Sequence, residues 1–303
     1  MSRRTALGVL IAVGALSIAA AGYQAPGSLS PKALEATKIE KVRENLYMIT
    51  GSNPTPQDAF SGGNTSVFIT DSGVVLVDTK LVGWGQVILD KIKTVTDKPV
   101  TTIINTHTHG DHTGNNAAFG ATVDIVAHEN TKANMEKMDA FKGDNAKFLP
   151  RKTYKDKLTL GSGKDRIDLY YFGRGHTNGD TWVVFPALRV MATGDMFAWK
   201  DAPRLDLPNG GSGLEYASTV GKALVTVKDI DTLIVGHSPL RTVAELREYQ
   251  RFMTEFVAAV QDAKKAGKSV DDAAASIDLN SKYKDYQNQR YKAAVQAIYE
   301  EIK

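Results

Sequence analysis

Three of the six histidines in this chain lie within six consecutive residues, and this cluster constrains the fold more than any other feature. The segment holds His107, His109 and His112, with Asp111 before the last of them. Imidazole nitrogens and carboxylate oxygens are typical ligands of zinc. Because unpaired polar groups are expensive to bury, this segment is not a core element. A His-rich polar loop is the alternative, and donors elsewhere in the chain argue against it.

Three further donors stand alone, each after a short apolar run. His176 follows residues 167–172, Asp195 follows residues 190–192 and His237 follows residues 232–235. Residues 100–104 lead to the histidine cluster in the same way. Such runs predict strands, and loops at strand ends can converge on one point. Together the two sets make more donors than one tetrahedral zinc needs, so their number predicts two metals.

These residues resemble the metallo-β-lactamase superfamily, whose five motifs occur here in order between about residues 40 and 240. Asp78, after the apolar run 74–77, matches the first motif, and the H-x-H-x-D-H segment matches the second. His176, Asp195 and His237 match the other three. The resemblance implies an α/β fold, a four-layer αββα sandwich, followed here by C-terminal helices.

The resemblance also implies how the donors are shared. It assigns His107, His109 and His176 to a first metal, and Asp111, His112 and His237 to a second. Asp195 would bridge the two metals, and Asp78 would steady a ligand from behind. The expected cofactor is a pair of Zn²⁺ ions, with iron and manganese left open.

The implied chemistry is hydrolysis by a metal-bound hydroxide, because zinc lowers the pKa of bound water to about 7. Asp111 would orient this nucleophile or carry its proton. The expected substrate is a small molecule with an ester, a thioester or a cyclic amide, including a β-lactam. Lactone hydrolases of the superfamily usually carry tyrosine three residues after the bridging aspartate, where this chain has Ala198.

Asp195 itself favours the glyoxalase II-like branch, since cysteine-free lactamases typically lack a bridging aspartate. Two alternatives of other classes remain open. The first is an iron-dependent sulfur oxygenase with one metal, which would leave His112 and His237 without a ligand role. The second is a metal-binding protein without turnover.

Cysteine is absent from the chain, which excludes a cysteine metal ligand, thiol catalysis and a lipoprotein anchor. The net charge is +3, and removal of residues 1–21 would take away two arginines and no acid. A nearly neutral protein gives no electrostatic reason to expect nucleic acid as a partner. The oligomeric state is left open.

The N-terminus predicts export. Residues 1–21 combine Arg3 and Arg4, an apolar stretch and the small residues 19–21, which is typical of a signal peptide. An uncleaved membrane anchor is the alternative, and either the twin-arginine or the general secretory route fits. We therefore expect a periplasmic or secreted protein with no membrane segment after cleavage. Residues 22–37 would be a linker, 38–240 the main domain and 241–303 a helical extension packed on it.

Helices are expected at 86–95, 243–265 and 284–302, with a further helix start at Ser269. Two segments are candidate walls of a substrate pocket. Residues 136–156 carry Met138, Phe141, Phe148 and Tyr154, and residues 197–213 carry Phe197, Trp199, Arg204 and a glycine-rich turn. His128 has no second histidine at metalloprotease spacing, so we expect it to be structural.

Overall fold

The computed structural model describes residues 29–52 and 57–302. The predicted signal peptide, residues 1–21, lies outside the described residues. Among those that are described, no helix is both long and apolar enough to cross a membrane.

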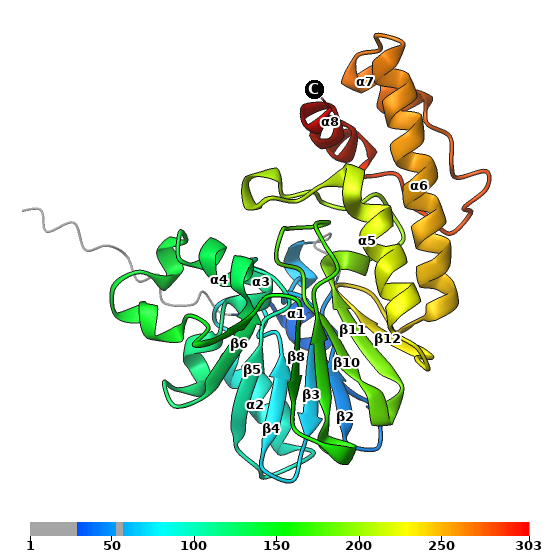
Figure 1. Ribbon diagram of the computed structural model, residues 1–303. Helices are drawn as coiled ribbons and strands as arrows, with labels where there is room; N and C mark the ends of the chain where they lie inside the picture. The colour runs from blue at the N-terminus through cyan, green and yellow to red at the C-terminus, as the bar shows by residue number, and fades with distance from the viewer. Residues whose placement is uncertain (1–28, 53–56, 303) are drawn as a thin grey trace, which may run out of the picture.

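Two mixed sheets form the centre of the molecule, and each is built from one continuous half of the chain (Figure 1). The first sheet, sheet A, contains β1 (Ile39–Arg43), β2 (Leu46–Ile49), β3 (Thr65–Ile69), β4 (Val74–Val77), β5 (Val100–Ile104), β6 (Asp124–His128) and β7 (Lys152–Tyr154). The second, sheet B, contains β8 (Lys157–Leu160), β9 (Ile167–Tyr170), β10 (Trp182–Phe185), β11 (Val190–Gly194), β12 (Thr232–Val235) and β13 (Arg241–Thr242).

The apolar strands are covered on both faces, as continuous apolar runs predict. In β4, Val75 and Val77 face the cluster between the sheets, whereas Val74 and Leu76 face a cluster under helix α2. This alternation follows from the two-residue period of a strand. Across the sandwich, Phe68 of sheet A meets Phe185 of sheet B, with ring centroids 5.0 Å apart.

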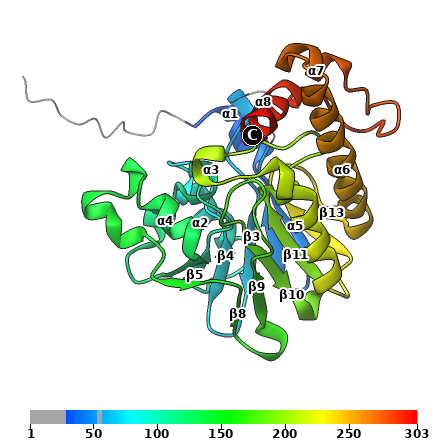
Figure 2. The same ribbon diagram turned by 45° about the horizontal axis from the view of Figure 1, so that its top comes forward.

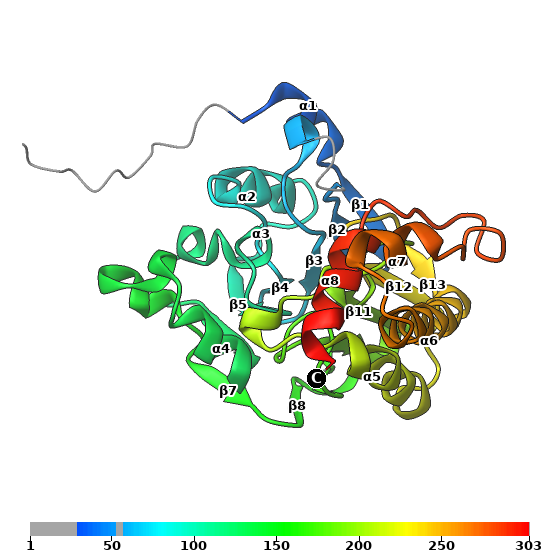
Figure 3. The same ribbon diagram turned by 90° about the horizontal axis from the view of Figure 1, so that it is seen from above.

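Helices close both outer faces and give the predicted four layers (Figure 3). The helix α2 (Gly85–Lys93) packs Ile88 and Ile92 against sheet A. On sheet B lie α5 (Gly213–Thr226) and α6 (Val243–Lys265), which share one apolar cluster with its strands. Short helices complete the framework: α3 (Gly110–Thr113) and α4 (Glu129–Met135) on the side of sheet A, with α7 (Val270–Ser276) and α8 (Tyr291–Glu301) near the end of α6 (Figures 1 and 2).

The helices of the C-terminal extension largely match those predicted from the sequence. The helix α6 has the predicted bounds and begins with a capping box between Thr242 and Glu245, and α7 begins after Ser269 as expected. The last helix differs, because it begins at Tyr291 and not near Lys284. The preceding residues leave the helical path, since the backbone N–H of Gln287 donates to the carbonyl of Lys200 at 2.8 Å.

The expected linker, residues 22–37, is also different where it is described. Residues Pro31–Ala36 form the helix α1, which buries Ala33. Thr37 ends this helix by donating its hydroxyl to the Ala33 carbonyl at 2.7 Å, and its Oγ1 also bonds the Ser61 hydroxyl at 2.8 Å. The helix is therefore attached to the main domain, which a Pro/Gly/Ser-rich composition did not predict.

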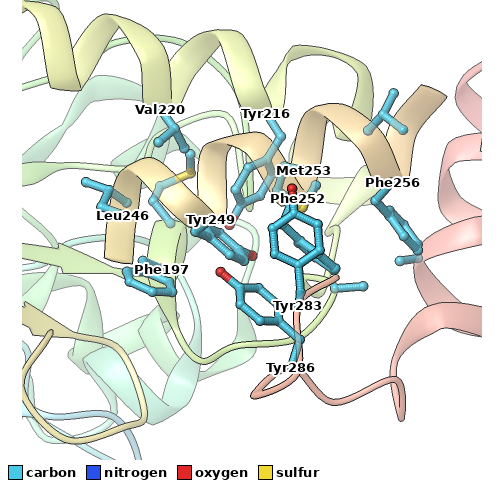
Figure 4. Packing of buried hydrophobic residues seen from close by; sticks show 14 of the residues in the cluster. Phe197, Tyr216, Val220, Leu246, Tyr249, Phe252, Met253, Phe256, Tyr283 and Tyr286 are labelled. Atoms are coloured by element: carbon cyan, nitrogen blue, oxygen red, sulfur yellow. The ribbon is translucent and has the colours of Figure 1, made fainter. Parts of the chain in front are cut away.

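An aromatic cluster joins the C-terminal extension to the loop after β11 of sheet B (Figure 4). Tyr249 of α6 stacks on Phe197 with a centroid distance of 4.6 Å, and Phe252 packs on Tyr286 at 4.5 Å. Phe197 lies two residues after Asp195, so the extension directly supports a loop that carries a predicted ligand.

Candidate metal centre

The seven predicted donors all follow strand ends, and the structure brings them together in two adjoining groups. Within each group, every candidate ligand atom lies within 4.8 Å of the others. The segment 107–112 follows β5, while the three separate donors follow β9, β11 and β12 of sheet B. The first group contains His107, His109, His176 and Asp195, and the second contains Asp111, His112 and His237.

The imidazoles of the first group each turn one nitrogen toward a common centre and anchor the other. His107 Nε2 is buried without a hydrogen-bond partner, and its Nδ1 lies 3.0 Å from the hydroxyl of Thr106. His176 Nε2 lies 2.9 Å from His109 Nδ1. The other nitrogen of His176, Nδ1, donates to the carbonyl of Arg204 at 2.7 Å. These anchors fix which nitrogen is available to a metal.

His109 is anchored by a carboxylate that the sequence did not identify. Its Nε2 lies 2.6 Å from Asp206 Oδ2, and Asn209 donates to the same oxygen at 2.8 Å. A carboxylate behind a ligand histidine is a common support of metal sites. Asp206 precedes a turn within the candidate wall 197–213, and nothing in its local sequence distinguishes it from an ordinary turn residue.

The second group is equally compact. His112 Nε2 and His237 Nε2 lie 3.2 Å apart, and Asp111 Oδ2 lies 3.3 Å from His237 Nε2 and 3.7 Å from His112 Nε2. His237 Nδ1 lies 3.2 Å from the Ser52 carbonyl oxygen, which anchors that ring. Asp111 is the most exposed of these donors, with 20% of its side chain accessible against 0% and 1% for the two histidines.

Asp195 lies between the two groups, with one carboxylate oxygen toward each. Its Oδ1 is 3.3 Å from Nε2 of both His112 and His237, and its Oδ2 is 3.5 Å from His176 Nε2. The hydroxyl of Tyr216, from α5, donates to the Asp195 carbonyl at 3.0 Å. This placement suits a carboxylate shared by two cations.

Two glycines allow this close approach. A Cβ atom at Gly236 would lie 2.0 Å from Asp195 Oδ1, and one at Gly63 would lie 2.2 Å from the His112 ring. Any side chain at these positions would displace a donor.

Asp78 lies behind the histidine segment. Its Oδ1 accepts the Thr106 N–H at 2.8 Å, and its Oδ2 accepts the Thr106 hydroxyl at 2.6 Å and lies 2.8 Å from His112 Nδ1. Its backbone is left-handed, with φ of 64°. Aspartate tolerates this conformation better than most residues, which lets one carboxylate turn back onto the loop.

The two groups differ in their affinity for protons. Burial, followed by the charge of His112, holds the pKa of His107 well below its usual value, and burial with His109 lowers the pKa of His176 to about 3. In the second group burial again favours the neutral rings, but Asp195 and neighbouring carboxylates outweigh it and raise the pKa of His112 and His237.

The donor set fits a bound divalent metal. His107 Nε2 and Asp195 Oδ1 are buried without hydrogen-bond partners, which is costly unless a cation completes them. Imidazole and carboxylate together suit zinc and its first-row neighbours.

Lys80 is a second residue near the centre that sequence reasoning missed. Its side chain is fully buried, and its ammonium donates to the carbonyls of Thr50 at 2.9 Å and Gly63 at 2.8 Å. Burial lowers the pKa of Lys80 to about 7. The N–H of Gly63 in turn donates to the Asp111 carbonyl at 2.9 Å, so Lys80 braces the ligand loop.

Of the residues predicted to form pocket walls, some line a cavity and others belong to the buried core. Met138, Phe141 and Phe148 line a cavity of about 420 Å³ together with Gly110 of the histidine segment. Tyr154 is instead buried and donates to the Thr181 hydroxyl at 2.9 Å, and Phe197 belongs to the aromatic cluster.

His128 has the structural place expected for it. It caps α4 by accepting the N–H of Asn130, and its Nε2 lies 2.8 Å from the Lys155 carbonyl. Its ring stacks on Tyr171.

Comparison with known proteins gives consistent results. Residues 59–237 match the model of the metallo-beta-lactamase superfamily. A "metallo-beta-lactamase type 2" of Elizabethkingia meningoseptica is 24% identical over 249 residues, which cover 80% of this chain and 93% of that protein. A protein with the same description from Bacillus sp. (strain 170) is 23% identical over 66% of this chain and 75% of its own length.

Solved structures agree on the fold. A metallo-beta-lactamase from Pontibacter korlensis superposes with a TM-score of 0.61 at 19% identity, covering 72% of this chain and 98% of the other. With the family model spanning more than half of the chain and the donors gathered at one site, the chain belongs to the metallo-beta-lactamase superfamily and is a metal-dependent hydrolase.

Proposed function

We propose that this protein is an exported dinuclear zinc hydrolase that cleaves an ester, a thioester or a cyclic amide. The observation that carries the proposal is the shared position of Asp195, with one oxygen toward each of two complete donor groups. His107, His109 and His176 would hold the first ion, and Asp111, His112 and His237 the second. A mononuclear oxygenase would leave the second group without a purpose.

Bound zinc would supply Lewis acidity and would make water a nucleophile near neutral pH. Within the second group, Asp111 is the donor that faces the open side of the centre. Its carboxylate stays ionised, since His112 and His237 overcome the effect of burial and lower its pKa. An ionised Asp111 would orient the attacking water and could take its proton only because bound zinc would make that water acidic, while the buried imidazoles stay fixed by their anchors.

A β-lactam is the first substrate to test, because relatives across most of the chain are described as metallo-beta-lactamases. Purified protein should contain two zinc ions per chain by elemental analysis. It should then be assayed on a chromogenic cephalosporin, a lactone, a thioester and a phosphodiester. Chelation should abolish turnover of the accepted substrate, and added zinc should restore it. One iron per chain, with oxygen consumed in the presence of a persulfide, would replace this proposal with the oxygenase.

Export rests on the sequence of residues 1–21 and is part of the same proposal. Mass spectrometry of the native protein should show a mature N-terminus near Gly22, and fractionation should place it in the periplasm or the medium. An intact Met1 in a cytosolic fraction would contradict export and leave the hydrolase assignment standing.

A further inference from the structure

Residues 204–213, called here the anchor segment, hold two of the three imidazoles of the first group. Nδ1 of His176 donates to the carbonyl of Arg204 at 2.7 Å, and the backbone N–H of Asp206 donates to the His176 carbonyl at 3.0 Å. The carboxylate of Asp206 lies 2.6 Å from His109 Nε2. The orientation of both rings therefore depends on the position of this one segment.

The anchor segment has little regular structure of its own to fix that position. Leu207–Asn209 form a single helical turn, and Gly210, Gly211 and Gly213 follow it closely. Glycine loses more conformational freedom on ordering than other residues do, so such a segment is costly to hold in one conformation. Contacts with the surrounding structure must offset this cost.

The anchor segment leads into α5, and a residue of α8 caps the start of that helix. The carboxylate of Glu301 accepts the N–H of Gly213 at 2.8 Å and the N–H of Leu214 at 3.2 Å. It also accepts the hydroxyl of Ser212, whose oxygen in turn accepts the N–H of Glu215 at 3.0 Å. The N–H groups of a first helical turn have no partner within the helix, and a negative charge suits this end of its dipole.

The capped end of the anchor segment is packed into the interior. Ser212 is fully buried, and its N–H donates to the carbonyl of Gly175, the neighbour of His176, at 2.8 Å. Ile298 of α8 packs so closely on Gly213 that a Cβ atom there would lie 2.4 Å from its side chain. The helices α5 and α8 lie side by side and share one apolar cluster (Figure 3). α8 thus holds the end of the anchor segment against the helical layer.

The rings of the second group have different supports. His112 is held by the carboxylate of Asp78 at 2.8 Å, and His237 by the carbonyl of Ser52 at 3.2 Å. In the part of the chain that the structure describes, no hydrogen bond joins the anchor segment to a donor of the second group. A change in α8 that reaches the metal centre through the anchor segment should therefore affect the first group alone.

We propose that Glu301 is a positioning residue for the first metal. By capping α5 it holds the anchor segment, and through that segment the rings of His109 and His176, in the arrangement that binds the ion. Glu301 lies outside residues 59–237, which match the family model. The inference rests on the part of the proposed function that gives the first group a metal ion.

The zinc affinity of each group, measured separately, tests this role. The first group is measured in a His237→Ala background and the second in a His176→Ala background, by competition with a chromogenic chelator. Glu301→Ala should weaken zinc binding by the first group roughly 3- to 30-fold, the range to which loss of a helix cap corresponds. The second group should change less than about twofold, because sites without shared contacts respond independently.

Glu300→Gln is the matched control, because Glu300 is the exposed neighbour on α8 and its carboxylate accepts from Gln296 of the same helix at 2.6 Å. It should leave both affinities unchanged. Glu301→Gln keeps the size of the side chain and one acceptor oxygen, so it should show a smaller loss that is again confined to the first group. This conservative variant decides the question if the alanine variant does not fold.

Two results would overturn the positioning role. Equal losses at both groups would show that Glu301 supports the fold in general and not the first group. An unchanged affinity of the first group would show that the anchor segment keeps its position without the cap.

The measurement needs no substrate, so it separates this inference from the proposed function. If the wild type binds zinc and shows the selective effect of Glu301→Ala but hydrolyses no ester, thioester or lactam, the proposed reaction fails and the positioning role stands. If the wild type hydrolyses one of these substrates and Glu301→Ala leaves the first group unchanged, the positioning role alone fails. A wild type that binds no zinc overturns both.

Discussion

The two sheets contribute to the metal centre in different ways. Sheet A delivers His107, His109, Asp111 and His112 from one segment after β5, whereas sheet B delivers one donor from each of three strand ends. In the segment of sheet A one carboxylate, Asp78, holds both the backbone at Thr106 and the ring of His112, while Asp206 holds the ring of His109. The donors of sheet B depend on separate supports, including backbone carbonyls and the aromatic cluster. The difference teaches that donors in one contiguous motif are easy to recognise and can share a support, while dispersed donors need separate supports.

The largest effect should come from Asp195, the donor that faces both groups. Asp195→Asn keeps the shape but removes a charge that offsets two cations, so both metals should be lost in part. Turnover should fall by more than about 100-fold, beyond the range of changes behind the ligands. Metal content by elemental analysis and kcat measure this, with the exposed Asp97→Asn as the control. Wild-type metal content and rate would show that the two groups are independent of Asp195.

Removal of one histidine from either group should deplete the metal of that group and leave the other metal bound. His176→Ala should deplete the first metal, and His237→Ala should deplete the second, so each variant should retain about one ion per chain. Zinc titration with a chromogenic chelator counts the ions. Loss of both ions in either variant would mean that the groups do not bind independently.

The two carboxylates behind the ligands, Asp78 and Asp206, test how much the shared support matters. Asp78→Asn should weaken metal binding by roughly 10- to 100-fold, and Asp206→Asn should fall at the lower end of that range. Asp78 holds the backbone N–H of Thr106 and the ring of His112, whereas Asp206 supports the ring of His109 alone among the donors. The asparagine replacement suits the left-handed backbone of Asp78, so the loss comes from the charge and from the acceptor oxygen that becomes an amide nitrogen. A larger loss for Asp206→Asn would reverse the comparison.

Lowering the pH should release the metal of the second group before the metal of the first. The pKa of His112 and His237 is raised, so protons are retained there to higher pH and must leave before a metal binds. The pKa of His107 and His176 is lowered, so these rings stay neutral as the pH falls. As the pH drops from about 8 to about 5, the second group should lose its metal first. Zinc calorimetry in two buffers of different ionisation enthalpy would detect the larger proton release; equal release from both sites would contradict it.

The smallest effect should come from the support of Asp195 by the helical layer. Tyr216→Phe removes the hydroxyl that donates to the Asp195 carbonyl and should cost about 1 kcal/mol of unfolding free energy. Urea denaturation measures this change. Tyr299→Phe removes an exposed hydroxyl and serves as the control. Identical stabilities for the two variants would show that the hydroxyl of Tyr216 contributes nothing to the loop.

Sequence reasoning reached the αββα fold and the gathering of the seven predicted donors at one site because both depend on short patterns. Apolar runs predict the strands, and histidine or aspartate at their ends marks the converging loops. It also reached the bounds of α6, since capping residues are local. The division of ligands between two zinc ions stays a prediction.

The features that the sequence did not predict depend on contacts between distant segments. Asp206 becomes important only because a turn brings it to His109, and Lys80 because three carbonyl or hydroxyl oxygens surround it in the interior. The prediction of helix for the residues between 284 and 290 was wrong for the same reason. Their backbone bonds to Lys200 instead of continuing a helix.

The order of strands along the chain has a consequence for folding. Because sheet A comes from the first half of the chain and sheet B from the second, no metal group can be completed until both halves have formed and docked. Metal binding is then coupled to the docking of the two sheets and would stabilise the junction between them. At a free zinc concentration 1,000 times the dissociation constant, one such site adds about 4 kcal/mol to the stability of the docked state. Depletion of zinc should therefore first loosen the junction between the halves, and amide hydrogen exchange should rise there while the strands within each sheet remain protected.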